Sequence, residues 1–389
     1  MSKHPSLSAE FVEPTLLRPA MTMEPYVPCW CMSGKKWKFC HKHRESKEPV
    51  PLGRIFHDMH RFASKGYCSH PLANTGCGKV INAHTIQRQG GLSRIAEDGH
   101  VYSVKEGFRK SIENEGPLEL YRIGARNAST FAGFCGVHDA ELFAPVERKA
   151  ATLNRESIFL LSFRAVAYEK FHKQISISSI EAQRQLDYGQ PFPQQVEIQT
   201  HLHLHKSGMQ RGLQDINNWK SHYDLSFVTG DYSTFRGYAC LFNQVLPVAC
   251  CGAFHPEVSF SGEPLQKISR GDADFEHIAV ALTPVDGRTL LTMGWYGADG
   301  GPGELFAKSY AALDAQIKSS AAIHLAFEHM ENTYCTPSWW DSIAEDARNR
   351  LKLRLTTGIG IGLPERSLTS LTELEPVLSG AVVEQELMI

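Results

Sequence analysis

Cysteine and histidine crowd a short segment near the start of the chain, PCWCMSGKKWKFCHKH at residues 28–43. Four donors share the spacing C-x-C-x8-C-H: Cys29, Cys31, Cys40 and His41. Thiolates and imidazoles in a tight loop suit tetrahedral Zn²⁺, and a loop this short cannot bury a core of its own. We therefore predict a zinc site whose metal ion supplies the folding energy, with His43 as the alternative fourth ligand.

The composition favours metal binding over disulfides. The chain has 389 residues, of which 42% are hydrophobic and 21% charged, as in ordinary globular proteins. No apolar run reaches the roughly 18 residues that span a bilayer, and residues 1–20 lack the apolar core of a secretory signal. We therefore expect a cytoplasmic protein with no membrane partner, in a reducing compartment where clustered cysteines bind metal.

A second group of donors is spread over residues 68–138. Cys68 and Cys77 precede the strand-like run KVIN, while Cys135 and His138 form a C-x-x-H pair where the helix-like run GVHDAELFAPVE begins. The run STFAGFC before this helix reads as a returning strand. Two strands and a helix around a second Zn²⁺ predict a treble-clef ββα unit, with His70 as the alternative to Cys77.

The charges are divided unevenly along the chain. Residues 1–150 contain 21 Lys and Arg against 15 Asp and Glu, a balance of +6. The remainder has 40 − 21 = 19 basic and 42 − 15 = 27 acidic residues, a balance of −8. We expect nucleic acid, if it binds, to meet the front half.

The chain is expected to be α+β and multidomain. The four expected parts are a flexible tail at 1–28, a zinc module at 29–50, a treble-clef domain at 51–150, and a larger α+β domain with an antiparallel sheet at 151–389. Expected helices cover residues 54–66, 154–175 (capped by Asn154), 210–223, 304–331 and 337–355. Expected strands lie in 235–244, 247–254 and 277–297, the last a hairpin turning at VDG.

The first cluster resembles the SEC-C motif, the zinc tail of the preprotein-translocase motor ATPase. The motif reads C-x-C-G-S-G-K-K-x-K-x-C-H/C, and the match includes all four donors, Ser33, Gly34 and the lysines. Met32 departs from it, because the motif has glycine there. The resemblance covers about sixteen residues and implies zinc binding and docking to a protein partner.

The second cluster resembles the HNH, or ββα-metal, nucleases. By this resemblance His84 would be the general base, Asn127 the loop asparagine, and Asp139 the ligand of a catalytic Mg²⁺ or Mn²⁺. Ala83 stands where the family often has a carboxylate, and residues 88–122 would be an insertion. Four arginines flank the expected site and could hold phosphates: Arg88, Arg94, Arg122 and Arg126.

Two other patterns carry less chemistry. THLHLHK would place His201, His203 and His205 on one face of a strand, where three imidazoles could bind a metal, although an exposed polar face is the simpler interpretation. The glycine-rich run WYGADGGPGELF opens a helix, where phosphate can bind, but it matches no phosphate-binding motif and is read as a loop.

The leading hypothesis is a metal-dependent HNH-like endonuclease that cleaves nucleic acid, with DNA favoured, in an architecture suited to bacterial antiviral defence. The alternative is a non-catalytic zinc adaptor that docks protein or RNA partners. An enzyme whose active site lies wholly in the C-terminal part, and assembly into a homo-oligomer, stay open.

Overall fold

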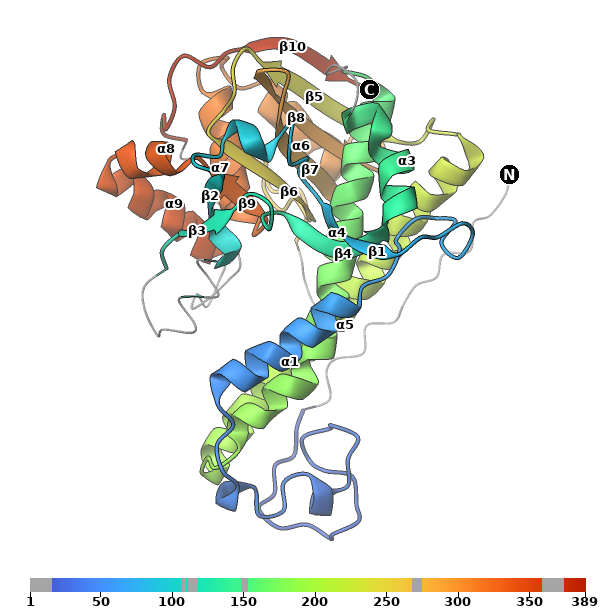
Figure 1. The fold of residues 1–389 in the computed structure, drawn as a ribbon, viewed down its shortest axis with the longest axis vertical. Coiled ribbons are helices and arrows are strands. Elements are labelled where there is room, and N and C mark those ends of the chain that lie inside the picture. The colour runs from blue at the N-terminus through green and yellow to red at the C-terminus, as the bar shows by residue number, and fades with distance from the viewer. Residues whose placement is uncertain (1–15, 107–109, 111–117, 148–152, 268–274, 359–373) are drawn as a thin grey trace. The chain divides into compact units, whose positions relative to one another are not determined.

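The computed structural model describes residues 16–106, 110, 118–147, 153–267, 275–358 and 374–389 (Figure 1). Backbone contacts divide the chain into two compact units. The first, here the knob unit, combines Met1–Lys65, Lys170–Asn217 and Ser269–Asp274, and the second, here the sheet unit, combines Gly66–Glu169, Asn218–Ile268 and Phe275–Ile389. These units do not follow the expected ranges 29–50, 51–150 and 151–389, since each is assembled from separate stretches. Most of the expected tail, residues 1–15, lies outside the described residues.

The knob unit is a cysteine-rich loop with helices. It contains the 3-10 turns η1 (Trp37–Phe39), η2 (Arg44–Ser46) and η4 (Arg184–Asp187), helix α1 (Leu52–Lys65), and parts of the long helices α4 (Arg155–Gln183) and α5 (Phe192–Thr229). Helix α1 confirms the helix expected at 54–66. The expected strand at THLHLHK is wrong, because these residues form two turns of α5.

Because they belong to helix α5, the three histidines do not all lie on one face, as they would in a strand. His201 and His205 stack one turn apart, with ring centroids separated by 6.2 Å, as side chains at i and i+4 of a helix do. The flanking sequence continues the helix for 38 residues, which outweighs the short alternating pattern. The structure describes no group of three metal donors that contains these histidines.

The sheet unit begins with a small two-stranded sheet and a helix. Strand β1 (Val80–His84) pairs antiparallel with β4 (Thr130–Cys135), and helix α3 (Gly136–Glu147) follows β4 without a loop. Phe134 and Phe143 are fully buried between strand and helix, with ring centroids 5.3 Å apart. The expected strand, strand and helix are confirmed.

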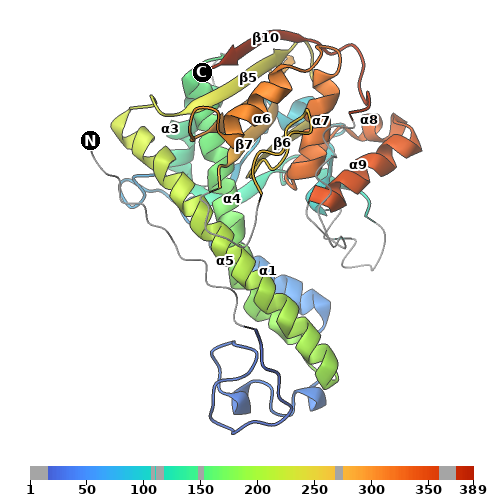
Figure 2. The same cartoon turned by 180° about the vertical axis from the view of Figure 1, so that it is seen from behind.

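A larger antiparallel sheet follows, in the strand order β10-β5-β8-β7-β6-β9-β2-β3 (Figure 1). Figure 2 shows its strands β10, β5, β7 and β6 from behind. The strands are β2 (His100–Ser103), β3 (Tyr121–Gly124), β5 (Arg236–Phe242), β6 (Val248–Phe254), β7 (Ile278–Val285), β8 (Arg288–Trp295), β9 (Thr333–Cys335) and β10 (Val383–Met388). Strands β2 and β3 come from the expected insertion, which also carries the 3-10 turn η3 (Leu92–Arg94). The insertion is therefore part of the large sheet.

The central strands are apolar on both faces because helices cover both faces. Helices α6 (Pro302–Ala311) and α7 (Lys318–His329) pack on the face that carries Tyr238 and Cys240. The opposite face is built of small residues so that α4 can approach closely. A Cβ added at Gly294 would lie 2.1 Å from Ser162 Oγ of α4. Burial of both faces explains why the strands do not alternate apolar and polar residues.

The remaining elements confirm most local predictions and correct two. The Asn154 side chain accepts the Ser157 N–H at 2.8 Å and caps α4, and the β7–β8 turn has Asp286 and Gly287 at φ 48° and 76°. The long helix expected at 304–331 is instead α6 and α7, because the chain turns after Ala311 so that both segments can pack on the sheet. The helix expected at 337–355 divides into α8 (Pro337–Ser342) and α9 (Glu345–Gly358).

Among the described residues, no helix combines the length and the apolar character needed to cross a bilayer.

Candidate functional site

The four donors of the first cluster converge. The ligand atoms of Cys29, Cys31, Cys40 and His41, here the knob cluster, all lie within 4.8 Å of one another, and all four side chains are buried. The Cys31 and Cys40 sulfurs are 3.5 Å apart, and His41 Nδ1 is 3.2 Å from Cys29 Sγ. Three sulfurs and one nitrogen at this separation could hold a metal ion, and Zn²⁺ prefers this donor set.

Backbone turns place these donors. The Cys29 N–H donates to the Lys35 carbonyl at 2.9 Å and closes the loop that carries Cys31. Within it, Met32 and Gly34 both have positive φ, 55° and 79°. Met32 therefore adopts the left-handed conformation at the position where the SEC-C motif has glycine, so the departure in sequence preserves the turn at the cost of some strain.

A polar network from another part of the chain supports the histidine. His41 Nε2 lies 3.0 Å from Asp187 Oδ2, so Nδ1 faces the sulfurs while Nε2 faces the carboxylate. Arg44 Nε donates to the other oxygen of Asp187 at 2.6 Å, and Gln199 Nε2 donates to Asp187 Oδ2 at 2.7 Å. A carboxylate behind a ligating histidine fixes its tautomer and orientation, as in many zinc sites.

Electrostatics couple the donors of the knob cluster, and the proton that the raised pKa of His41 retains would have to leave before Nδ1 could bind a metal ion. Burial alone would lower the pKa of His41, but hydrogen bonds with Asp187 and with the cysteines raise that pKa to about 10. Hydrogen bonds from Cys29 and Cys40 hold the pKa of Cys31 well below its usual range. The cluster therefore stabilises a thiolate, which is the form that binds a cation. His43 is exposed and lies outside the group, so the alternative ligand is wrong.

The four donors of the second cluster also converge, in the ββα region. The ligand atoms of Cys68, Cys77, Cys135 and His138, here the clef cluster, lie within 4.8 Å of one another. Cys135 ends β4 and His138 lies in the first turn of α3, so the donors stand where strand passes directly into helix. The sheet edge fixes Cys68, because Tyr67 and Ser69 donate to the carbonyls of Ala132 and Gly133 at 2.9 and 2.8 Å.

The clef cluster is more open than the knob cluster. Cys77 is exposed and Cys68 is half-buried, while Cys135 and His138 are buried. His70 is not a member of the group. Its ring stacks on His138 at a centroid distance of 4.0 Å, and its Nδ1 accepts the Leu72 N–H. His70 therefore orients the ligating ring by packing.

His84 ends β1, as the HNH resemblance requires of a general base. The side chain is half-buried, and its Nε2 has no hydrogen-bond partner among the described residues. Burial lowers the pKa of His84, a hydrogen bond with the Arg126 backbone opposes this, and the charges of Arg88 and Arg164 lower the pKa further. The neutral imidazole with a free ring nitrogen is the form that can accept a proton.

Asp139 lies in the first turn of α3. Its Oδ1 is buried and unpartnered within the described ranges, and burial raises the pKa of this carboxyl, opposed by Arg164. His84 and Asp139 belong to no preformed group of three donors in the part of the chain that the structure describes. Asn127 is exposed in the loop before β4, where the adjacent Arg126 backbone interacts with His84.

The four expected phosphate-binding arginines do not form one group. All four are exposed, but only Arg88 and Arg126 are linked to His84 by charge or hydrogen bonding. Arg122 donates to the Glu97 carbonyl and lies 3.6 Å from Asp98. Arg94 lies in η3 and is not among the charges that act on His84.

The glycine-rich run before α6 is a loop that already holds an anion from the chain itself. Glu276 accepts the N–H groups of Ala298 and Gly303 at 3.2 and 3.0 Å, one on each carboxylate oxygen. A Cβ at Gly297 or Gly301 would lie 2.5 or 2.4 Å from this carboxylate, which explains those glycines. The loop therefore binds an internal carboxylate at a helix N-terminus.

Sequence reasoning missed three residues of these sites. Asp187 lies 146 positions beyond His41 and carries no local signal. Arg164 and Glu147 pair at 2.6 Å and both act electrostatically on His84 and Asp139. The one signal available in the sequence was an arginine within the apolar run of α4. A charge in such a position is expected to be buried, and buried charges are normally paired.

No family model, no curated protein and no solved structure matches the chain.

Proposed function

We propose that the sheet unit is a metal-dependent phosphodiester hydrolase of HNH-like design that acts on nucleic acid. The observation that carries the proposal is a pair of buried, unpartnered polar atoms, His84 Nε2 and Asp139 Oδ1. They come from the end of β1 and the start of α3; β1 pairs with β4, and the junction of β4 with α3 carries Cys135 and His138 of the clef cluster. Among the described residues 17 buried side-chain nitrogen and oxygen atoms have no hydrogen-bond partner, and these two belong to residues that both interact electrostatically with Arg164 and Glu147.

Each residue has a definite role in this proposal. His84 Nε2 accepts the proton of the attacking water, and the Arg126 backbone orients the ring for that step. Asp139 supplies a hard oxygen ligand to Mg²⁺ or Mn²⁺, which when bound would stabilise charge on the phosphate and the leaving oxygen. Zn²⁺ in the clef cluster keeps β4 and α3 in register, so that the two groups stay preorganised.

The test is nicking of supercoiled plasmid DNA by the full chain with Mg²⁺ or Mn²⁺. We expect His84→Ala and Asp139→Asn each to reduce the rate by roughly 10²-fold or more, the typical contribution of a general base. The matched control is His60→Ala, because His60 is an exposed histidine on α1 that belongs to neither metal-binding group. Zinc content, measured by elemental analysis, must be unchanged in all three variants.

Equal nicking by the wild type and His84→Ala would reject the assignment. So would nicking that persists in Asp139→Asn with unaltered metal dependence.

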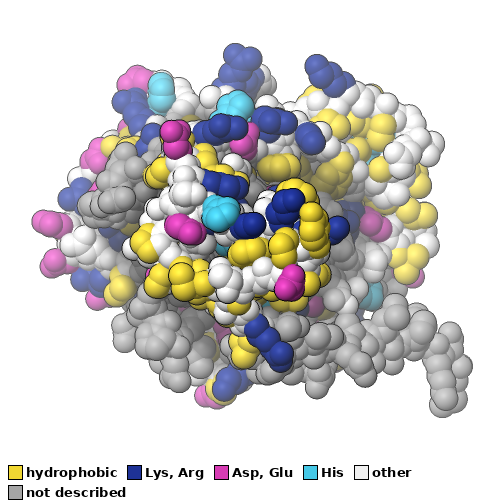
Figure 3. Space-filling model, turned by 90° about the horizontal axis from the view of Figure 1, so that it is seen from below, with side chains coloured by type: hydrophobic (Ala, Val, Ile, Leu, Met, Phe, Trp, Pro, Cys, Tyr) yellow, Lys and Arg dark blue, Asp and Glu magenta, His cyan; other side chains and the backbone are white. Residues whose placement is uncertain are grey.

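A second candidate function is docking through the knob unit. Tyr26, Met32 and Phe39 are exposed on the cysteine-rich loop, and Lys38 Nζ lies 5.1 Å above the Tyr26 ring. Figure 3 shows lysine and arginine side chains intermixed with apolar ones on the lower face. Such a mixture suits an acidic protein surface with apolar anchors. If the knob unit is an adaptor, Phe39→Ala should abolish the binding of its protein partner. The same substitution should leave plasmid nicking unchanged.

A further inference from the structure

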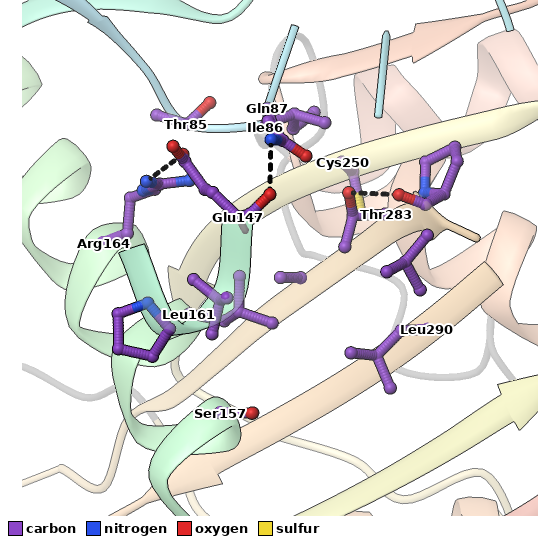
Figure 4. A pocket seen from close by; sticks show the side chains of 15 residues that line it. Thr85, Ile86, Gln87, Glu147, Ser157, Leu161, Arg164, Cys250, Thr283 and Leu290 are labelled. Atoms are coloured by element: carbon purple, nitrogen blue, oxygen red, sulfur yellow. Dashed lines mark hydrogen bonds and ion pairs between the residues drawn. The ribbon is translucent and has the colours of Figure 1, made fainter. Parts of the chain in front are cut away.

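A pocket in the sheet unit lies directly beyond His84. It is lined by the residues that follow β1, the last turn of α3, one face of α4 and the adjacent strands (Figure 4). Its polar lining includes Thr85, Gln87, Glu147 and Arg164. The rest of the lining is mostly apolar, including Leu161 and Leu290, so charges in this pocket are weakly screened.

Arg164 is the buried cation of this pocket. Its side chain is 2% exposed, and its guanidinium lies 3.7 Å from the centroid of the Phe143 ring. One terminal nitrogen donates to Glu147 Oε1 at 2.6 Å, while Nε has no partner among the described residues. The fork of donors is thus only partly used, although a guanidinium can bind two oxygens of one anion.

Glu147 is the more exposed side of this pair. It is the last residue of α3, and its side chain is 27% exposed against 2% for Arg164. Its backbone carbonyl accepts a hydrogen bond from Gln87 Nε2 at 3.0 Å, which fixes the helix end over the pocket. Figure 4 shows Glu147 between Gln87 and Arg164, joined to both by interactions.

We propose that Arg164 binds a phosphate group of the substrate, and that Glu147 occupies the guanidinium until the substrate displaces it. In the protein without substrate, the Glu147 carboxylate occupies the position of the phosphate, because both groups accept hydrogen bonds from the Arg164 guanidinium. Displacement moves Glu147 toward solvent and frees the terminal nitrogen of Arg164, which together with the unpartnered Nε can then form two parallel hydrogen bonds with the phosphate. Thr85, the residue after His84, lines the same pocket as Arg164, so a phosphate held there would lie close to the proposed general base.

The inference rests on the proposed function for the identity of the substrate, but the anion site can be tested without cleavage. Dimethyl phosphate, a small phosphodiester, is titrated into the metal-loaded full chain, and the ¹H–¹⁵N signal of Arg164 Nε is followed by NMR. We expect this signal to shift on binding and to be absent in Arg164→Lys, which keeps the charge but removes the fork.

The variants are expected to act in opposite directions. Glu147→Gln removes the internal competitor, so the affinity for dimethyl phosphate should rise by about tenfold, whereas Arg164→Lys should lower it. Gln87→Ala releases the helix end without changing any charge and should also raise the affinity. An ion pair with a purely structural role would instead make Glu147→Gln and Arg164→Lys lose stability together, with no gain in binding.

The outcomes separate this inference from the proposed function. Dimethyl phosphate binding that strengthens in Glu147→Gln, without any plasmid nicking, would retain the anion site and reject the nuclease. Nicking that depends on His84, with an Arg164 signal that never shifts in the wild type, in Glu147→Gln or in Gln87→Ala, would reject the anion site alone. Folding of each variant is checked by thermal unfolding.

Discussion

The two metal clusters have the same donor set, three cysteines and one histidine, but different surroundings. In the knob cluster all four donors are buried and the histidine is backed by Asp187. In the clef cluster Cys77 is exposed, and within the described residues no carboxylate pairs with His138, whose ring instead stacks on His70. The donor set therefore determines which metal ion each cluster could bind. The residues around the donors determine how much of the fold depends on that ion.

The difference follows from what each cluster holds together. The knob loop has few apolar contacts of its own: its buried core consists of Trp30, Trp37 and the three cysteines. The clef cluster joins elements that also share backbone hydrogen bonds and the buried Phe134 and Phe143. We conclude that the first ion would act chiefly in folding, and the second chiefly in positioning the residues beside it.

Removing one cysteine from each cluster is expected to give the largest contrast. Cys40→Ser should abolish metal binding at the knob cluster and unfold residues 29–47, because the loop has only a small apolar core of its own. Cys77→Ser should also lose or weaken one ion, yet leave β1, β4 and α3 folded. Elemental analysis gives the zinc content, and limited proteolysis reports which segment has opened. Equal protease sensitivity of the two variants in the ββα region would break the comparison.

Replacing the carboxylate behind His41 tests the supporting network. Asp187→Asn should weaken metal binding at the knob cluster by about 10–100-fold, because the histidine loses its orienting charge and Arg44 loses its partner. The clef counterpart, His70→Ala, removes only a stacking ring and should change affinity much less. Competition with a chelating dye measures both affinities. A larger loss in His70→Ala would reverse the ranking of the two sites.

The pH dependence of nicking tests whether His84, beside the clef cluster, is the base of the reaction. A base must be neutral, and burial with nearby arginines lowers the pKa of His84 below its ordinary value of 6.5. Activity should therefore be lost only as the pH falls below 6.5, at the lowered pKa of His84. Arg88→Gln removes one of the charges that lower this pKa, so the acid limb should move to higher pH.

The matched control is Arg94→Gln, because Arg94 is also exposed but does not act on His84. An acid limb that is the same in both variants and in the wild type would assign the titration to another group.

The smallest expected effect concerns one left-handed residue in each metal-binding loop. Met32 in the knob loop and Asn74 before Cys77 both have positive φ, 55° and 77°. Asparagine tolerates this conformation better than methionine, so Met32→Gly should raise the stability of its loop slightly, by at most about 1 kcal/mol, and Asn74→Gly by less. Metal competition and thermal unfolding of each variant measure the gain. Weaker metal binding in Met32→Gly would show that the turn is unstrained.

Local features of this fold were predictable because they depend on neighbours in the chain. Strand β1, strand β4 and helix α3 follow from apolar patterns within single stretches, and the β7–β8 hairpin follows from its Asp-Gly turn. The two Cys3His groupings were also predicted, and their eight donor side chains converge into two groups that could each hold a metal ion.

The failures share one cause, which is competition with distant contacts. The alternating histidines near residue 203 suggested a strand, but the long helix around them prevailed. The expected helix 304–331 breaks because two shorter helices cover the sheet better than one. The expected insertion at 88–122 gave no sign that its strands β2 and β3 would join the large sheet, since β9, which pairs with β2, lies more than 200 residues further along the chain.

The sequence by itself determined the donor sets, the turns and the helix caps, because these depend on side chains a few positions apart. The tertiary structure decided which partners stand behind the donors: Asp187 behind His41, and the Arg164–Glu147 pair beside His84 and Asp139. Hydrogen bonds and ion pairs act over a few ångströms in space, so no spacing along the chain encodes a partner brought in from a distant helix.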